Sequence, residues 1–237
     1  MENFTGVNIL NCSHAFNCPC LSTAENNLIG TIPDEVSALF TLERLDVFSN
    51  AIFGTIPQGI FNLTELILLD LEENLLTGPA TPTSLFDLSA LIAYRVSDNS
   101  LTGSISTRIG TLLNLEQLWM AENPLMERIP SQIASLTNLE SMFLYESNLQ
   151  GSLPSELGTL TALQDLRVYG NQLQGFIPTQ LFSATSLMAL RLELNFFSGM
   201  IPSQIGNLVN LEDFRIFQNS LSGAIPSEIG RLTLLGK

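Results

Sequence analysis

The chain has 237 residues, of which 45% are hydrophobic, and 23 acidic residues against 9 basic ones give it a net charge of −14. This charge argues against nucleic acid or an anionic membrane surface as a partner, since both require a positive footprint. No apolar run reaches the roughly 18 residues of a membrane helix, and the start, MENFTGVNIL, lacks the basic and apolar regions of a signal peptide.

Residues 1–17 are the least repetitive part of the chain, and we expect them to form an imperfect N-terminal cap or the remnant of an earlier coil. Cys12, Cys18 and Cys20 all precede the first complete repeat. A disulfide from Cys12 to Cys18 or Cys20 would leave one thiol over, which suggests a missing partner upstream. His14 adds a fourth possible zinc ligand, but these spacings are tighter than those of structural zinc sites. A cap disulfide is therefore favoured over a metal site.

Residues 18–237 repeat a single unit, which is clearest in the segment LTALQDLRVYGNQLQGFIP at 160–178. Seven of the eight spacings between its asparagine positions are 24 residues, and the interval from Asn74 to Asn99 is 25. A fixed period of this size, with the pattern L-x-x-L-x-L-x-x-N, is the signature of a leucine-rich-repeat solenoid. The predicted fold class is α/β: a right-handed solenoid whose coils are stabilised by stacking on their neighbours.

Each residue type of the repeat has a structural reason. Leu163, Leu166 and Val168 are expected to point inward from a short strand, while Asp165 and Arg167 alternate with them and point outward. The asparagine follows at a bend, where its amide can satisfy buried backbone groups. The structural asparagines of the prediction are Asn26, Asn50, Asn74, Asn99, Asn123, Asn171, Asn195 and Asn219, and Ser147 stands in the sixth repeat.

The segments after the asparagine, such as IFGTIP at 52–57, LQGSLP at 149–154 and LSGAIP at 221–226, resemble the plant-type subclass of leucine-rich repeats. In that family such repeats form ectodomains of receptor-like kinases and receptor-like proteins, and secreted inhibitors of cell-wall hydrolases. The resemblance implies a horseshoe with a parallel sheet on the concave side, short helical turns on the convex side and a cysteine-bearing cap. It carries over no catalytic residue.

Two irregularities stand out along the array. The segment Gly78-Pro79-Ala80-Thr81-Pro82 has two prolines and one added residue, so we expect a bulged loop there. Leu232 and Leu235 begin a tenth copy that stops at Lys237 without a polar cap, from which we expect an array truncated at its C-terminus.

The sequence offers no nucleophile with a base, no glycine loop before a lysine and no metal cluster outside the cap, so we expect a protein that is not an enzyme and uses no cofactor. The outward positions of the strands should instead form two columns of side chains. The first column contains Asp46, Asp70, Arg95, Trp119, Phe143, Arg167, Arg191 and Arg215. The second contains Phe48, Glu72, Ser97, Ala121, Tyr145, Tyr169, Glu193 and Phe217.

Four of the eight arginines fall in the first column, and the only tryptophan and two of the three tyrosines lie in the two columns. One interpretation is that these side chains simply pair across strands, with Arg191 neutralising Glu193. The other is a binding surface, since Trp, Tyr and Arg dominate binding hot spots. Its ligand would be an extended peptide or protein with acidic groups. The predicted ligand-binding residues are Arg95, Trp119, Phe143, Tyr145, Arg167, Tyr169, Arg191, Arg215 and Phe217.

The leading hypothesis is a non-enzymatic recognition module that binds a protein, peptide or glycan on its concave face. It would be the sensing part of a receptor-like protein, extracellular or membrane-associated, and the sequons at Asn3, Asn11 and Asn62 fit secretion. One alternative is a secreted hydrolase inhibitor that uses the acidic patch of Asp46, Asp70 and Glu72 to meet a basic cleft. Another is a cytoplasmic scaffold that assembles other proteins.

Overall fold

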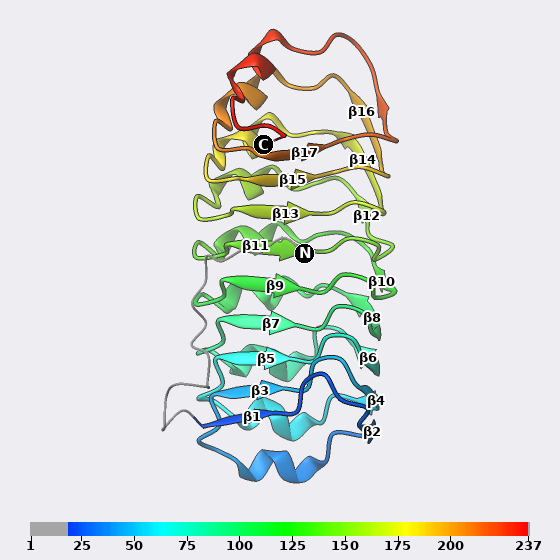
Figure 1. Ribbon diagram of the computed structural model, residues 1–237, viewed down its shortest axis with the longest axis vertical. Helices are drawn as coiled ribbons and strands as arrows, with labels where there is room; N and C mark the ends of the chain where they lie inside the picture. Colours follow the sequence, from blue (N-terminus) through cyan, green and yellow to red (C-terminus); the bar gives the residue numbers. More distant parts are fainter. Residues whose placement is uncertain (1–18, 237) are drawn as a thin grey trace.

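The computed structural model describes residues 19–236, which form one elongated solenoid of stacked coils (Figure 1). Within these residues, one strand from each coil joins a nine-stranded parallel sheet, which we call the concave sheet. Its strands are β1 (Cys20–Ser22), β3 (Arg44–Asp46), β5 (Leu68–Asp70), β7 (Ala93–Arg95), β9 (Gln117–Trp119), β11 (Ser141–Phe143), β13 (Asp165–Arg167), β15 (Ala189–Arg191) and β17 (Asp213–Arg215). This arrangement confirms the predicted leucine-rich-repeat solenoid.

A second layer of strands follows the asparagine positions and forms two further parallel sheets. The first contains β2 (Ile29–Gly30), β4 (Ala51–Thr55), β6 (Leu75–Pro79), β8 (Ser100–Ser104) and β10 (Leu125–Met126). The second contains β12 (Gln150–Gly151), β14 (Gln172–Phe176), β16 (Phe196–Gly199) and β18 (Ser220–Leu221). The break between them lies next to the coil in which Ser147 replaces the asparagine, and a single bridge from Arg128 to Gln150 spans it.

The convex side is built of short 3-10 turns, so the expected helical turns are present but are not α-helices. They are η1 (Asp34–Ala38), η2 (Gln58–Asn62), η3 (Thr83–Asp87), η4 (Thr107–Thr111), η5 (Ser131–Ser135), η6 (Ser155–Thr159), η7 (Thr179–Ser183), η8 (Ser203–Asn207) and η9 (Ser227–Arg231). Proline precedes each turn except η4, where the Ser106 hydroxyl accepts a hydrogen bond from the Arg108 backbone N–H. The fixed φ of proline suits this position because it sets the chain direction into the turn.

One continuous hydrophobic core runs along the solenoid axis. Leu163, Leu166 and Val168 are fully buried, as their inward positions in the repeat predict. Burial of each such side chain contributes about 1.5 to 3 kcal/mol. Tyr94 takes the place of a core leucine, and its buried hydroxyl donates to the Ala80 carbonyl at 2.8 Å. That carbonyl belongs to the 25-residue coil, so the tyrosine ties down the segment that carries the added residue.

The asparagine side chains connect consecutive coils. Asn171 is 6% exposed, and its Nδ2 donates to the Leu144 carbonyl of the preceding coil at 2.8 Å. Its Oδ1 accepts from the backbone N–H groups of Ser147 and Leu149 at 3.1 and 2.9 Å. Ser147 is fully buried and reaches only backbone carbonyls, including that of Tyr145 at 2.8 Å. Ser147 therefore does not supply the acceptor that the asparagine Oδ1 offers to the previous coil in other repeats.

Candidate functional site on the concave sheet

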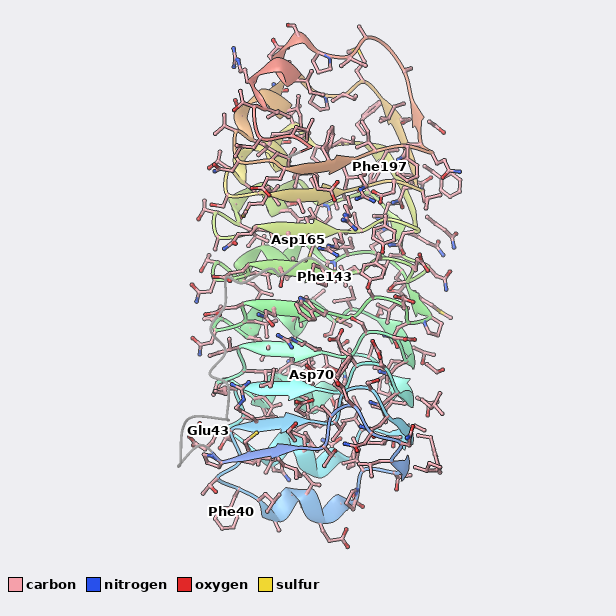
Figure 2. The ribbon with its side chains drawn as sticks, viewed as in Figure 1. Phe40, Glu43, Asp70, Phe143, Asp165 and Phe197 are labelled. Carbon is pink, nitrogen blue, oxygen red and sulfur yellow. The ribbon has the colours of Figure 1, made fainter. Side chains whose placement is uncertain are left out.

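The outward columns expected from the sequence are present in the concave sheet. In-register pairing aligns Asp46, Asp70, Arg95, Trp119, Phe143, Arg167, Arg191 and Arg215 in the first column. Asp70 and Phe143 mark two levels of this column in Figure 2. Backbone hydrogen bonds continue the ladder two residues further, so that Glu193 lies between Tyr169 and Phe217 in the second column. Neighbouring strands lie about 4.8 Å apart.

A third outward column lies two residues before the first; only its member Asp165 was expected to point outward, and its continuation along the array was missed in the sequence. It contains Arg44, Leu68, Ala93, Gln117, Ser141, Asp165, Ala189 and Asp213. The same alternation that exposes the first two columns would have found it. Its polar members bind the first column: Gln117 Oε1 accepts from Arg95 Nε at 2.9 Å, and Ser141 Oγ accepts from the Trp119 indole at 2.8 Å. This column fixes the side chains that the sequence marked as ligand contacts.

Each arginine of the first column faces a carboxylate. The closest N–O distances are 3.0 Å for Arg95 with Asp70, 2.6 Å for Arg167 with Asp165, 2.7 Å for Arg191 with Asp213 and 2.9 Å for Arg215 with Asp213. The expected pair of Arg191 with Glu193 is not formed, because Arg191 turns to Asp213 instead. The arginine row is therefore largely neutralised by the protein itself.

The centre of the first column is a closed stack of rings and guanidinium groups. Trp119 and Phe143 stack with centroids 4.8 Å apart and an interplanar angle of 17°. The Cζ of Arg95 lies 4.1 Å from the Trp119 ring centroid, and that of Arg167 lies 4.6 Å from that of Phe143. Both outer ring faces are thus covered by cations, a favourable arrangement. A ligand on this column meets ring edges rather than ring faces.

In the second column, Tyr145 and Tyr169 stack with centroids 4.6 Å apart and an interplanar angle of 4°. Burial and the neighbouring Tyr169 and Glu122 raise the pKa of the Tyr145 hydroxyl, so it stays protonated and can donate a hydrogen bond. Phe143 connects the two columns, with its ring centroid 6.4 Å from that of Tyr145. These rings form a continuous half-buried aromatic surface at the middle of the sheet.

The remaining predicted ligand residues lie toward the C-terminal end of the sheet. Arg191 is half-buried, whereas Arg215 and Phe217 are exposed on the last coil of the sheet. The structure therefore brings all nine predicted ligand residues onto one face. That they bind a ligand stays a prediction.

Two side chains of the second column are buried and polar: the Ser97 hydroxyl lies beside the Glu72 carboxyl, where hydrogen bonding partly offsets the rise in pKa that burial causes, whereas Glu193 Oε2 has no hydrogen-bond partner among the described residues. Glu193 is 4% exposed and Ser97 is 6% exposed. Burial of the Glu193 carboxyl raises its pKa, because desolvation disfavours the charged form. An unpartnered buried group is costly, so Glu193 Oε2 marks a place where the hydrogen-bonding capacity of this face is unsatisfied.

An acidic edge borders the N-terminal half of the concave sheet. The residue before the asparagine position has a positive φ in successive coils, at Glu73, Asp98, Glu122 and Glu146. Burial and the Asp70 carboxylate raise the pKa of nearby Glu72 to about 7. The pKa of Glu122 is also raised, first by burial and then by Asp98 and Glu146. The recurring acidic residue before the asparagine was the available sequence signal for this edge.

Other expected features fall outside the site. Within residues 19–236, no three His, Cys, Asp or Glu side chains are grouped so as to hold a metal ion. Across the same residues, no helix has the length and apolarity required to cross a membrane. Cys20 begins β1 and is half-buried. Cys12, Cys18 and His14 lie outside the described residues, and so does the expected cap of residues 1–17.

Solved structures similar to this chain include plant receptors. The plant peptide hormone receptor RGFR1, in complex with RGF2, shares 32% identity at a TM-score of 0.81, over 91% of this chain and 38% of that one. The Arabidopsis receptor kinase HAESA, in complex with the peptide hormone IDA and the co-receptor SERK1, shares 33% identity at a TM-score of 0.86, over 90% and 36%. The chain thus spans well under half the length of these receptors.

A plant ice-binding protein is also similar, with 29% identity and a TM-score of 0.74, over 87% of this chain and 74% of that one. No protein-family model matches the chain, and no curated protein sequence does. The assignment to a family therefore rests on the similar solved structures, the 24-residue period and the in-register parallel strands. The chain is a leucine-rich-repeat protein with repeats of the plant type.

Proposed function

We propose that the chain is a recognition module that binds an extended peptide along its concave sheet, as the sensing part of a larger receptor-like protein. The observation that carries this proposal is the half-buried aromatic surface of Trp119, Phe143, Tyr145 and Tyr169, whose rings are locked by stacking and by partners in the third column. Rigid aromatic side chains give contact area at little entropy cost. The peptide complexes of two similar receptors support a ligand of this class.

The dimensions of the surface suit a short extended segment. From Trp119 on β9 to Arg215 on β17 there are four inter-strand steps, which span about 19 Å at about 4.8 Å per step. An extended peptide rises about 3.3 Å per residue, so about six residues cover this distance. Side chains of the ligand would then meet one coil after another, which allows each coil to contribute to specificity.

The ion pairs of the arginine row argue against the acidic ligand that this row suggested in the sequence. An acidic ligand would have to displace Asp165 from Arg167 or Asp213 from Arg191. Replacement of one carboxylate by another brings little net gain. We therefore propose that the arginines position the aromatic rings, and that acidic groups are not the main determinant of the ligand.

We further propose that the module works outside the cell, as part of a longer protein. Asn62, the one sequon asparagine within the described residues, is exposed at the end of η2 on the convex side. A glycan there would leave the concave sheet clear. Expression in a eukaryotic secretory host followed by mass spectrometry of the Asn62 peptide tests this point; an unmodified peptide would count against an extracellular role.

The experiment that tests the binding function is selection of linear peptides from a random phage-displayed library on the immobilised chain. Selected peptides should lose binding to Tyr145→Ala and keep binding to Gln132→Ala, because Gln132 is exposed in η5 on the convex side. Loss with the convex variant alone would move the site away from the concave sheet.

A second candidate function, ice binding, is favoured by a separate surface. Thr55, Thr77 and Ser100 pair in register across β4, β6 and β8, and all three are exposed. Thr77 Oγ1 donates to the Gly54 carbonyl at 3.2 Å, which fixes its orientation. A regular row of oriented hydroxyl groups can order water, and one similar structure is an ice-binding protein.

The ice-binding candidate has a direct test. Thermal hysteresis and ice recrystallisation are measured for the parent, for Thr77→Lys and for Tyr169→Ala. Ice binding through this row predicts activity in the parent and in Tyr169→Ala, and its loss in Thr77→Lys. An inactive parent removes this candidate.

A further inference from the structure

Glu193 presents an unsatisfied carboxylate on the concave face. It occupies an outward position in the second column, two residues after the end of β15 (Ala189–Arg191), and is 4% exposed. Its Oε2 has no hydrogen-bond partner among residues 19–236. Within this range the carboxyl receives a hydrogen bond only from the Glu193 backbone N–H, and a buried carboxylate oxygen without a donor is costly. This position therefore calls for a donor that the described part of the chain does not supply.

The nearest cations are directed elsewhere. Arg191 Nε donates to Asp213 Oδ2 at 2.7 Å, and Arg215 Nε donates to Asp213 Oδ1 at 2.9 Å. Both guanidinium groups are thus turned toward the third column, which lies on the opposite side of the first column from Glu193. They lower the pKa of Glu193 through space, but burial outweighs them and the pKa remains raised.

The flanking side chains suit a cationic ligand group. Tyr169 and Phe217 are the neighbours of Glu193 in the second column, one strand to each side, at about 4.8 Å per strand. Aromatic rings beside a carboxylate attract a cation through their faces while the carboxylate accepts its hydrogen bonds. Phe217 is 53% exposed, so its ring can reorient on a fast timescale when a ligand group approaches.

We propose that Glu193 is the anchoring carboxylate for a basic group of the ligand, an ammonium or guanidinium that lies between Tyr169 and Phe217. The inference rests on the proposed peptide-binding function and specifies the charge of the group that enters the C-terminal end of the site. The ligand group is then positively charged, whereas the arginine row had suggested a negatively charged one. In the free protein that row is already paired with carboxylates, whereas Glu193 Oε2 has no partner within residues 19–236.

The test uses the parent and two matched variants against one random linear peptide library. Glu193→Gln keeps the shape of the side chain and removes its charge. Glu212→Gln removes an equal charge from an exposed side chain just before β17, outside the second column. Melting curves for both variants check folding. Peptides selected on the parent and on Glu212→Gln should be enriched in lysine or arginine at one position, and those selected on Glu193→Gln should not.

One selected peptide is then synthesised with its basic residue and with an uncharged counterpart, norleucine for lysine or citrulline for arginine. The charge should strengthen binding to the parent by about tenfold to a hundredfold and make little difference to binding by Glu193→Gln. An equal effect of the charge on both proteins would overturn the assignment of Glu193.

The outcomes separate this inference from the proposed function. Peptides that depend on Tyr145 but carry no basic residue, or that carry acidic ones, leave the concave site standing and remove the role of Glu193. Peptides that ignore both Tyr145→Ala and Glu193→Gln, or no enrichment at all, contradict the two together.

Discussion

Arg191 and Asp213 form an ion pair across neighbouring strands, with Nε and Oδ2 separated by 2.7 Å. Arg215 shares the same carboxylate at 2.9 Å. The arginine column by itself had suggested an acidic ligand, but these two pairs show that the arginines at this end already have a counter-ion within the protein. The arginines of β15 and β17 were visible in one column, but their counter-ion stands in a column that is recognised only when the strand alternation is extended backward by two residues.

We predict that Asp213→Asn turns the C-terminal end of the concave face into an anion site. Two guanidinium groups then lose their counter-ion, so an acidic peptide that is not bound by the parent should bind the variant at low salt, and weaken as salt is added. Stability should fall by about 1 kcal/mol or less, because the pairs are partly exposed. Fluorescence anisotropy with a labelled poly-glutamate peptide measures the change, and equal binding to parent and variant would contradict it.

Asn171→Ala should destabilise the solenoid strongly. The substitution removes the acceptor of two backbone N–H groups and the donor of the Leu144 carbonyl. Each buried group left unpaired costs about 1 to 3 kcal/mol. Urea unfolding measures the loss of free energy. Asn138→Ala is the control, since this exposed asparagine makes one bond, to the Leu113 carbonyl at 3.1 Å. An equal loss in the two variants would show that the amide ladder has no special weight.

The sequence predicted the solenoid well because each repeat of the sequence forms one coil of the fold. The same pattern recurs along the array: inward leucines, such as Leu163 and Leu166, and an asparagine at the bend, such as Asn171. A departure from the pattern in one coil therefore does not change the predicted fold. The site was less accessible. Whether Arg167 is free or paired depends on Asp165, two residues earlier, and whether Glu193 is satisfied depends on which way Arg191 turns. Such rotamer choices follow from packing between coils and leave no periodic signal.

Glu127→Gly should stabilise the protein. Glu127 occupies the position at which most coils carry glycine, and it has a φ of 68°. The left-handed conformation costs a residue with a Cβ about 1 to 2 kcal/mol relative to glycine, so its release should outweigh the greater entropy of glycine in the unfolded chain. Differential scanning calorimetry should show a raised Tm. Glu140→Gly, at a half-buried position without positive φ, should show no gain; a similar rise in both would refute the strain argument.

The stability of the protein should fall as the pH rises from about 4.5 to 7. Burial and Asp70 raise the pKa of Glu72 from 4.5 to about 7. In this window the folded state therefore holds a proton that the unfolded state releases, and the free energy of unfolding decreases with pH. The contribution of Glu72 is on the order of 1 to 2 kcal/mol after allowance for its partial exposure.

Glu72→Gln removes this contribution and should flatten the pH dependence. Part of the slope should remain, since the pKa values of Asp70, Glu122 and Glu193 are raised as well. Urea unfolding of parent and variant at about pH 5 and about pH 7.5 compares the slopes. Identical slopes in the two proteins would mean that Glu72 titrates normally.

The most direct test of the concave binding site is the dissociation constant of one selected peptide for two alanine variants, measured by isothermal titration calorimetry. Tyr169 lies in the aromatic surface, stacked on Tyr145, whereas Gln180 is exposed in η7 on the convex side. Truncation of an aromatic anchor costs about 1 to 3 kcal/mol, so Tyr169→Ala should weaken binding by about tenfold or more, and Gln180→Ala should bind as the parent does. Unchanged binding by Tyr169→Ala together with weakened binding by Gln180→Ala would contradict the account.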